Sequence, residues 1–329
     1  MKIVTSVGFT CSGSSVINNL LREYDNFCEL TPNNECRFLQ DPDGISDLEY
    51  NLFDNRHRLN SEYAIKRYLK YTEKYDVRNF RQIFGKEWDK YNKEFVNSII
   101  MFSYNSYWHA DLRDLTLLQK LKYYSCRATR IIFSKIFGIS RENNKNYFPN
   151  KKMFLPINDR NEFINKVNIF TNNLFQFLNK DNKEFGVVDQ LVPPRNIKRY
   201  MKYVQGLYVI VVDRDPRDVY IEALLKNDRA FPKDVKQFCQ IYRDNRIGNI
   251  ENDENVLYIK FEDLVLNYND SIDKINKFLD INIKHHINQG KYFSIEKSKK
   301  NIELWKKYPE FSNQIKYIEN NLKEYLYND

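Results

Sequence analysis

The N-terminal stretch constrains the fold of this chain more than any other segment. Residues 2–7, Lys-Ile-Val-Thr-Ser-Val, are short and β-branched, and residues 8–15 are small and polar. Apolar residues at helical spacing follow over residues 16–21. A strand, a loop and a helix in this order make half of a βαβ unit, so the sequence predicts an α/β fold with a parallel sheet.

Later segments supply further strands for such a sheet. Residues 208–212, Tyr-Val-Ile-Val-Val, are continuously apolar, as is typical of a parallel strand that is covered on both faces. Residues 256–260 form another strand, followed by a helix that begins near residues 269–271, and residues 186–188 are a fourth candidate. We therefore expect a central parallel sheet flanked by helices on both faces.

Residues from about 50 to 180 are helical and aromatic in pattern, with few Gly or Pro, and we interpret them as a large helical insertion in a single domain, residues 1–329. Within this region an apolar stripe at spacings of four and three residues predicts a helix, formed by Leu117, Leu121, Tyr124, Ala128 and Ile131. The stripe either packs on the core with a solvated basic face behind it, or belongs to a surface that meets an anionic glycan or lipid headgroups.

Positive charge gathers in the same region. The chain carries a net charge of +8, which by itself favours anionic partners only weakly. The net charge of residues 120–152 is also +8, because this segment has nine basic residues and one acidic residue, Glu142. The basic residues are Lys120, Lys122, Arg127, Arg130, Lys135, Arg141, Lys145, Lys151 and Lys152. The stretch belongs to no recognised nucleic-acid-binding motif, so nucleic acid is not an expected partner.

The sequence also indicates the compartment. The N-terminus enters its first strand without the stages of a signal peptide, and no apolar run reaches the length of about 18 residues that marks a transmembrane helix. The cysteines are odd in number and follow no metal-ligand spacing: Cys11, Cys28, Cys36, Cys126 and Cys239. Reduced thiols fit this pattern best, so we expect a cytoplasmic protein without a metal.

The loop over residues 8–15 has the spacing of a phosphate-binding loop, G-x-x-x-x-G followed by two small residues. In such a loop the backbone N–H groups and the positive end of the next helix face an anion. Ser14 stands where ATPases and kinases carry the Lys that contacts the β- and γ-phosphates, which makes a nucleotide kinase a poor alternative. The loop alone would also fit a purely structural turn.

Other segments resemble landmarks of the sulfotransferase family. Residues 214–219, Arg-Asp-Pro-Arg-Asp-Val, resemble its R-[DN]-P-[RK]-D-V signature, and residues 261–264, Phe-Glu-Asp-Leu, resemble the strand-end [YF]-E-D-L. With the loop and the tail at residues 297–306, these landmarks follow the family's order over nearly the whole chain. The general likeness is to bacterial carbohydrate sulfotransferase-like proteins. It implies a P-loop-like sulfotransferase fold that binds the sulfate donor PAPS and its product PAP.

The resemblance assigns donor contacts to particular residues. It places the 5′-phosphosulfate on the loop residues Cys11, Ser12, Gly13, Ser14 and Ser15, and the 3′-phosphate on Arg214. Arg214 directly follows a buried strand, where ligands of open α/β folds bind, and a guanidinium there can bind a phosphate bidentately. A basic loop that closes over the same phosphate would contain Lys297, Lys299 and Lys300, unless these lysines form a solvated face. Asp215, Pro216 and Asp218 are expected to shape and cap the following helix.

Two positions depart from the family's pattern. Cys11 stands where the loop commonly carries Lys or Arg, a cation that offsets charge on the bridging oxygen as sulfate departs. Glu222 replaces the Ser that the family has eight residues after Arg214, and it would repel a 3′-phosphate if it pointed inward. These departures favour the alternative of a catalytically silent PAP-binding protein on the same fold.

A candidate base lies soon after the first helix. Residues 34–39, Asn-Glu-Cys-Arg-Phe-Leu, resemble the N-E-x-x-F-[FL] segment of heparan-type glycan sulfotransferases. This resemblance implies that Glu35 takes the proton of a carbohydrate hydroxyl and that Arg37 supplies the charge that Cys11 lacks; a surface turn is the alternative. His57 and His109 are rival bases, since members acting on small alcohols use a His. The expected activity is sulfuryl transfer from PAPS to a hydroxyl of a cell-surface glycan.

Overall fold

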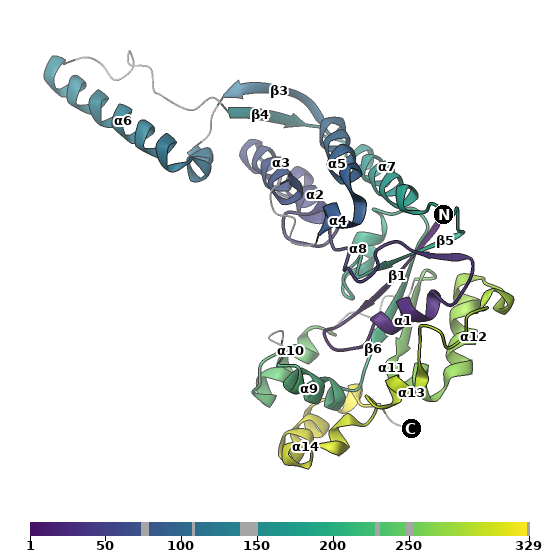
Figure 1. The fold of residues 1–329 in the computed structure, drawn as a ribbon. Coiled ribbons are helices and arrows are strands. Elements are labelled where there is room, and N and C mark those ends of the chain that lie inside the picture. Colours follow the sequence, from purple (N-terminus) through teal and green to yellow (C-terminus); the bar gives the residue numbers. More distant parts are fainter. Residues whose placement is uncertain (74–78, 107–108, 139–150, 228–230, 248–252, 328–329) are drawn as a thin grey trace.

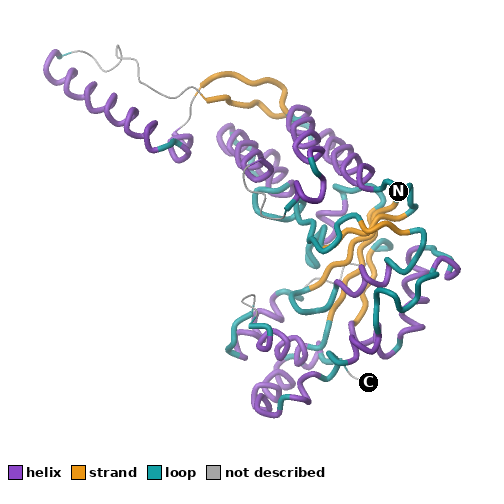
Figure 2. The backbone as a smooth tube through the Cα atoms, in the orientation of Figure 1, coloured by secondary structure: helices purple, strands orange, loops and turns teal. Residues whose placement is uncertain are grey.

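The computed structural model describes residues 1–73, 79–106, 109–138, 151–227, 231–247 and 253–327. Its centre is a sheet of parallel strands, which in chain order are β1 (Lys2–Gly8), β2 (Phe27–Glu29), β5 (Phe185–Asp189), β6 (Leu207–Asp213) and β7 (Val256–Lys260). Their spatial order is β2-β5-β1-β6-β7, and every neighbouring pair is parallel. Figure 2 shows these strands fanning out at the centre of the molecule. The predicted α/β fold with a central parallel sheet is confirmed.

Helices flank the sheet and form a layer that extends away from it (Figure 1). They are α1 (Ser15–Leu21), α2 (Ile45–Phe53), α3 (Arg58–Glu73), α4 (Phe80–Phe84), α5 (Lys86–Ser98), α6 (Leu117–Phe137), α7 (Arg160–Leu178), α8 (Ile197–Met201), α9 (Pro216–Leu225), α10 (Val235–Asp244), α11 (Phe261–Leu266), α12 (Tyr268–Leu279), α13 (Ile295–Lys299) and α14 (Ser312–Asn321). Short 3₁₀ turns include η1 (His109–Asp114) and η4 (Leu304–Lys307). The helix expected near residues 269–271 is α12, and α11 precedes it directly after β7.

Alternation along the strands divides the core between the two faces of the sheet. In β1, Ile3 and Val7 join the cluster that contains residues of α2, α3, α5 and α7, whereas Val4 joins the cluster that contains residues of α1 and α12. Successive side chains of a strand point to opposite faces, so each face buries its own set of helices. This is why the β6 segment at residues 207–212 is continuously apolar: both of its faces are covered.

The region at 50–180 is largely helical, as predicted, but it also contains two strands that the sequence did not predict. These are β3 (Ile100–Ser106) and β4 (Lys151–Pro156), which pair antiparallel with Tyr104 opposite Met153. The helix predicted from the apolar stripe is present as α6. Figure 1 shows α6 and this hairpin at the far end of the helical layer, away from the sheet.

The C-terminal part of the chain forms a third cluster beside α9. Phe238 and Tyr242 of α10 pack with Ile318 of α14 and with residues of α9. Because α9 directly follows β6, this cluster fixes the position of the chain at the carboxyl end of a central strand. Within the described residues, no helix has both the length and the apolarity that a membrane crossing requires.

Candidate functional site

The loop after β1 folds tightly over its own first glycine. A Cβ on Gly8 would lie 2.2 Å from Ser12 Oγ and 2.9 Å from Ser14 Cβ, so only glycine fits there. Cys11 and Gly13 have φ angles of 61° and 82°, in the left-handed region, and a Cβ on Gly13 would lie 2.7 Å from the Phe261 ring. Alternating right- and left-handed residues turn successive N–H groups toward one side, which forms an anion-binding concavity.

Several polar groups of this loop are not used by the protein itself. The Ser12 amide donates to the Phe9 carbonyl over 2.9 Å, but the amides of Gly13, Ser14 and Ser15 have no protein acceptor among the described residues. Ser12 Oγ is buried and likewise has no hydrogen-bond partner in the part of the chain that the structure describes. Buried polar groups are nearly always paired, so these donors are suited to a bound anion.

Arg214 lies beneath this loop, just beyond the end of β6. Its side chain is only 2% exposed, and its guanidinium stacks over the Phe261 ring at 4.9 Å from the centroid. The Nη1 atom donates to the Cys11 carbonyl over 3.1 Å, and Nη2 donates to the Asn301 carbonyl over 2.6 Å. The buried Nε atom has no acceptor among the described residues. Arg214 therefore ties the loop to the C-terminal tail and retains one unused donor.

Glu222 points inward, toward Arg214. Its carboxylate forms an ion pair with Arg214 Nη1 and a second ion pair with the Nζ atom of Lys226, the residue that directly follows α9. Burial raises the pKa of Glu222, but the charges of Arg214 and Lys226 outweigh it and hold this pKa below its ordinary value. The Glu222 carboxylate is thus ionised. It already pairs with Arg214, the cation that the resemblance assigns to the 3′-phosphate.

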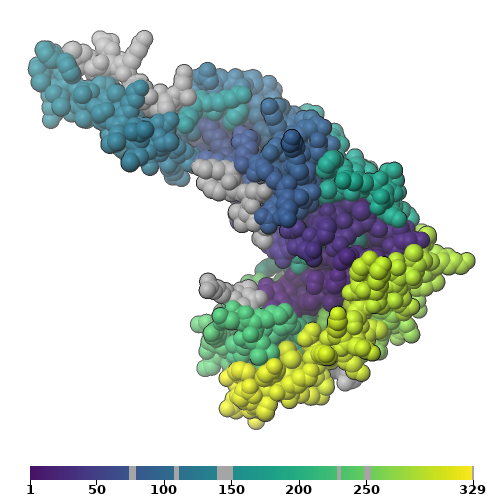
Figure 3. All heavy atoms as spheres, viewed as in Figure 1, coloured from purple at the N-terminus to yellow at the C-terminus, as the bar shows by residue number. Residues whose placement is uncertain are grey.

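These groups line one cavity of about 500 Å³ at the carboxyl edge of the sheet. Its lining residues are Gly8, Phe9, Thr10, Cys11, Ser12, Gly13, Ser14, Ser15, Val16, Glu35, Arg37, Asp189, Gln190, Arg214, Glu222, Lys226, Phe261, Ser298 and Asn301. Figure 3 shows the surface hollowed between the blue helical layer and the green residues of α9 and α10, with N-terminal residues in purple at the floor of the hollow. The cavity brings together the loop, Arg214, Glu35 and Arg37, which are far apart in sequence.

Glu35 and Arg37 reach the cavity because of an alternation in their segment. Cys36 and Phe38 are fully buried, and the Cys36 amide donates to the Asp189 carbonyl over 2.8 Å, which anchors the segment to β5. The residues between them face the other way: the Glu35 side chain is 46% exposed, and Arg37 Nη1 lies 3.7 Å from its carboxylate. Arg37 Nε also contacts Asp41 at 3.2 Å, so two carboxylates share its charge.

Asp189 and Gln190 are site residues that the sequence analysis missed. They lie at the end of β5, and the Gln190 side-chain amide donates to Ser14 Oγ over 3.0 Å, which supports the loop. Burial, reinforced by the negative charge of Glu35, raises the pKa of Asp189 to about 6, although hydrogen bonds from Asn18 and Ser6 oppose this. A signal for them did exist, because both directly follow the predicted strand at residues 186–188.

The raised pKa of Asp189 predicts a pH-dependent contribution to stability. A folded-state pKa of about 6, against 3.8 for an ordinary Asp, means that the folded chain binds more protons between these values. The contribution of Asp189 is therefore fully present below pH 3.8 and is lost as the pH rises through about 6. Relative to Asp189→Asn, the parent should gain up to about 1.4 kcal/mol per pH unit on acidification from 6 to 4. Urea unfolding of both proteins at several pH values measures this, and parallel pH curves would contradict it.

The late lysines are placed differently from the loop residues. From their segment, the residues that line the cavity are Ser298 and Asn301, whereas Lys297, Lys299 and Lys300 are exposed. Lys299 lines a separate cavity of about 290 Å³ together with Asp218 and Trp305. The lysine run is thus a largely solvated face of α13 in this structure, and Lys226 is the additional cation at the site.

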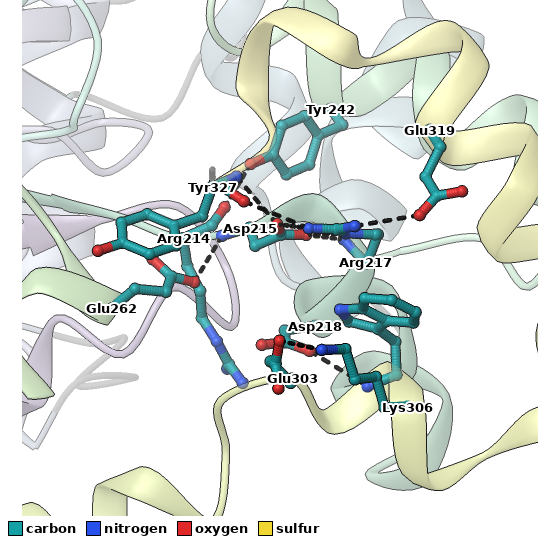
Figure 4. A network of polar contacts seen from close by, with 11 residues as sticks. Arg214, Asp215, Arg217, Asp218, Tyr242, Glu262, Glu303, Lys306, Glu319 and Tyr327 are labelled. Atoms are coloured by element: carbon teal, nitrogen blue, oxygen red, sulfur yellow. Dashed lines mark hydrogen bonds and ion pairs between the residues drawn. The ribbon is translucent and has the colours of Figure 1, made fainter. Parts of the chain in front are cut away.

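The signature after Arg214 holds the tail in place (Figure 4). As predicted, Asp215 caps α9 by accepting from the Arg217 amide over 2.8 Å, with Pro216 in the first turn. Arg217 grips the Asp215 carboxylate through Nε and Nη2, at 3.0 and 2.7 Å. Asp218 instead accepts from the Trp305 amide over 3.2 Å, and Tyr327 donates its amide to Asp215 over 3.0 Å.

The Glu of the second landmark belongs to the same network. Glu262 Oε1 accepts from the Asp215 amide over 2.9 Å, and burial raises the pKa of Glu262 to about 7. The Tyr242 hydroxyl donates to the Arg214 carbonyl over 2.6 Å. Together these bonds fix the backbone around Arg214, so the motif positions the guanidinium rather than contacting a ligand with every residue.

The rival bases lie elsewhere. His57 is exposed and precedes α3, and it does not line the cavity of the loop. His109 begins η1, and its side chain lies outside the described residues, as do Arg141, Glu142 and Lys145. In the described part of the chain, no three His, Cys, Asp or Glu side chains gather as a metal site would require.

Comparisons with known proteins give structural neighbours only. No family profile matches the chain, and no curated protein matches its sequence. A mouse sulfotransferase complexed with PAP aligns with 41% of this chain and 52% of its own, at 17% identity and a TM-score of 0.25. This chain thus spans about half the length of that protein.

Two further neighbours align over most of the chain. Retinol dehydratase, in complex with androsterone and the inactive cofactor PAP, aligns with 92% of this chain and 67% of its own, at 15% identity and a TM-score of 0.29. A sulfotransferase from Mycobacterium avium aligns with 97% of this chain and 76% of its own, at 12% identity and a TM-score of 0.34.

Proposed function

We propose that this protein transfers a sulfuryl group from PAPS to a hydroxyl of a carbohydrate, a glycan of the cell surface in particular. The observation that carries the proposal is the single cavity in which an unused set of loop amides, a buried Arg214 and the carboxylate of Glu35 meet. The order of motifs along the chain supports a sulfate donor over a nucleoside triphosphate, since Ser14 replaces the Lys that a kinase needs.

The residues present fit a donor that carries phosphate at both ends. The amides of Gly13, Ser14 and Ser15 and the buried Ser12 hydroxyl would hold the 5′ end. Arg214 would hold the 3′-phosphate, since its buried Nε lacks an acceptor among the described residues. When bound, PAPS supplies an activated sulfuryl group that passes to the acceptor oxygen while PAP leaves.

Transfer to an alcohol also requires a proton acceptor and positive charge near the leaving phosphate. Glu35 lines the cavity with a side chain that is 46% exposed, so a bulky acceptor can reach it; it would accept the hydroxyl proton. Besides Arg214, the cations Arg37 and Lys226 line the cavity. They would offset the negative charge that develops on the leaving phosphate, because Cys11 supplies no positive charge for this purpose. The preference for a carbohydrate rests on the segment around Glu35 alone.

A second candidate function is a silent PAP-binding protein on the same fold. The pairing of Glu222 with Arg214 favours it, because a 3′-phosphate has to compete with this carboxylate for the guanidinium. Cys11 favours it as well, since the loop then lacks a cation of its own. Both candidates require PAP to bind, and only the first requires turnover.

Calorimetric titration with PAP and with AMP tests the nucleotide site that both candidates share. We expect PAP to bind at least tenfold more tightly, a difference of about 1.4 kcal/mol, because only PAP offers a phosphate to Arg214. ATP is the control for a general preference for negative charge, and it should bind more weakly than PAP. Equal affinities for PAP and AMP would remove the assignment of Arg214 to the 3′-phosphate.

A further inference from the structure

Helix α6 turns its apolar side outward. The predicted stripe is exposed along its whole length, with Leu117 at 75%, Leu121 at 60%, Tyr124 at 58% and Ile131 at 44% exposure, so the alternative that it packs on the core is wrong. The other large exposed apolar side chains of the helix are Leu118, Ile132, Phe133, Ile136 and Phe137. Soluble proteins rarely expose so large a contiguous apolar surface unless it meets a partner.

The covered side of α6 is the opposite one. Its less exposed residues are Gln119, Tyr123, Cys126, Arg130 and Ser134, spaced four, three, four and four residues apart. At 3.6 residues per turn this stripe lies roughly 140° around the helix from the apolar one. An ordinary surface helix turns its apolar stripe toward the protein, whereas α6 presents it to the solvent.

Positive charge borders the exposed apolar face. Residues 117–137 contain five basic residues and no Asp or Glu: Lys120, Lys122, Arg127, Arg130 and Lys135. On a helical projection Lys120 and Arg127 flank one side of the apolar stripe and Lys122 flanks the other, whereas Lys135 lies in line with the stripe in the last turn and Arg130 lies on the covered side. Long basic side chains at such borders can extend to a charged surface while their methylene groups stay with the apolar face.

The position of α6 leaves this face accessible. Figure 1 and Figure 3 show the helix projecting from the far end of the helical layer, well away from the sheet and the C-terminal half of the chain. Two more basic residues, Lys151 and Lys152, begin the neighbouring strand β4. The projecting end is therefore both apolar and cationic.

We propose that α6 is a membrane-docking helix that lies in the plane of an anionic bilayer surface. Apolar side chains on one face with cations at its borders are the pattern of interfacial amphipathic helices, which insert only to the depth of the headgroup boundary. A crossing helix is not implied, because α6 lacks the apolarity for it. The proposal is independent of the nucleotide site.

Charge decides between this occupant and two others. A second copy of the chain that packs the apolar face of its α6 against this one would bring Lys120, Lys122, Arg127 and Lys135 of each helix together without a carboxylate from either helix, which is unfavourable. A free anionic glycan would satisfy the cations but would leave the exposed Leu, Ile and Phe side chains in water. An anionic bilayer satisfies both kinds of side chain.

Flotation of the purified full chain with lipid vesicles tests this proposal. We expect binding to phosphatidylcholine vesicles that contain phosphatidylserine and at least tenfold weaker binding to pure phosphatidylcholine, since each basic residue near an anionic surface contributes about fivefold. The variant Leu117→Ser/Leu121→Ser/Ile131→Ser should lose at least tenfold in vesicle affinity. Lys120→Gln/Arg127→Gln should lose a similar factor on the anionic vesicles alone.

A matched control removes apolar side chains of similar exposure from other elements. Ile169→Ser/Ile283→Ser/Ile287→Ser replaces residues that are 58%, 53% and 63% exposed, and it should bind vesicles like the parent. Circular dichroism checks that both triple variants stay folded, and Tyr124→Trp should show a blue-shifted emission on anionic vesicles. Failure of the parent to bind anionic vesicles would overturn the proposal. If the parent instead forms a concentration-dependent dimer, and the variant Leu117→Ser/Leu121→Ser/Ile131→Ser does not, a second copy of the chain covers the apolar face.

Discussion

Arg214→Ala should abolish most of the preference for PAP over AMP and should also destabilise the fold by about 3 kcal/mol. The first effect follows because the variant lacks the guanidinium to which the 3′-phosphate is assigned, and a charge-assisted hydrogen bond contributes about 1.5–3 kcal/mol. The second follows because Glu222 would be left largely buried with only Lys226 as a partner, and breaking a buried ion pair typically costs about 3–5 kcal/mol. Calorimetry and urea unfolding measure the two effects separately.

Variants of neighbouring residues separate binding from stability. Arg217→Ala is the matched control, since this arginine belongs to the same motif but contacts Asp215 and Glu319 outside the loop cavity. It should lose stability and keep the preference for PAP. Glu222→Gln removes the competing charge and keeps the shape, so it should bind PAP more tightly than the parent does. An Arg214→Ala protein that discriminates as well as the parent would show that Arg214 is purely structural.

The sheet was predictable because its central strands are buried on both faces. The run at residues 208–212 is apolar without interruption, and the structure extends it by one residue at each end, whereas the run at 256–260 coincides with the half-buried β7. The missed strands lack that signal. β2 is only three residues long at the sheet edge, and β3 and β4 pair across more than forty residues while much of β3 is exposed. Their pairing is non-local, so no periodicity within either segment reveals it.

The site was predictable in part, for a similar reason. Arg214 and the loop carry local motifs, whereas the inward direction of Glu222 depends on how α9 leaves β6. The lysine run shows the same limit. The resemblance implied a basic loop near residue 300 with a solvated face as the alternative, and Ser298 and Asn301, three residues apart, are the residues of this segment that line the cavity. Sequence shows which side chains are present, but the docking of a short helix decides which of them face the ligand.

Periodicity likewise predicted α6 but not its environment. The spacing of its apolar residues is the same whether they pack on a core or face a bilayer. Only the exposure of Leu117 and Leu121 in the folded chain distinguishes the two, because it shows that the apolar stripe is the uncovered one.

Glu35→Gln is expected to lower sulfuryl transfer by about 10²–10⁴-fold, the usual contribution of a positioned general base. Gln keeps the shape of the side chain and one acceptor oxygen but cannot take a proton at neutral pH. The fold and the affinity for PAP should stay nearly unchanged, because the Glu35 side chain is 46% exposed and lies opposite the buried Cys36. Transfer of labelled sulfate from PAPS to carbohydrate acceptors, with calorimetry of PAP on the same variant, measures both quantities.

Three further variants decide whether the base has been assigned to the right residue. His57→Asn and His109→Asn test the rival bases that the small-alcohol branch of the family suggests. If one of these variants is inactive while Glu35→Gln transfers sulfate at the full rate, the histidine is the general base. That outcome would also weaken the carbohydrate proposal. Asp189→Asn tests a second carboxylate of the cavity, whose pKa of about 6 would appear as an acid limb in the pH profile of transfer and vanish in the variant. If the parent transfers sulfate to no hydroxyl, the variant Cys11→Lys tests the reason, since it restores a cation to the loop. Sulfuryl transfer by this variant would identify the missing positive charge as the cause of the parent's inactivity.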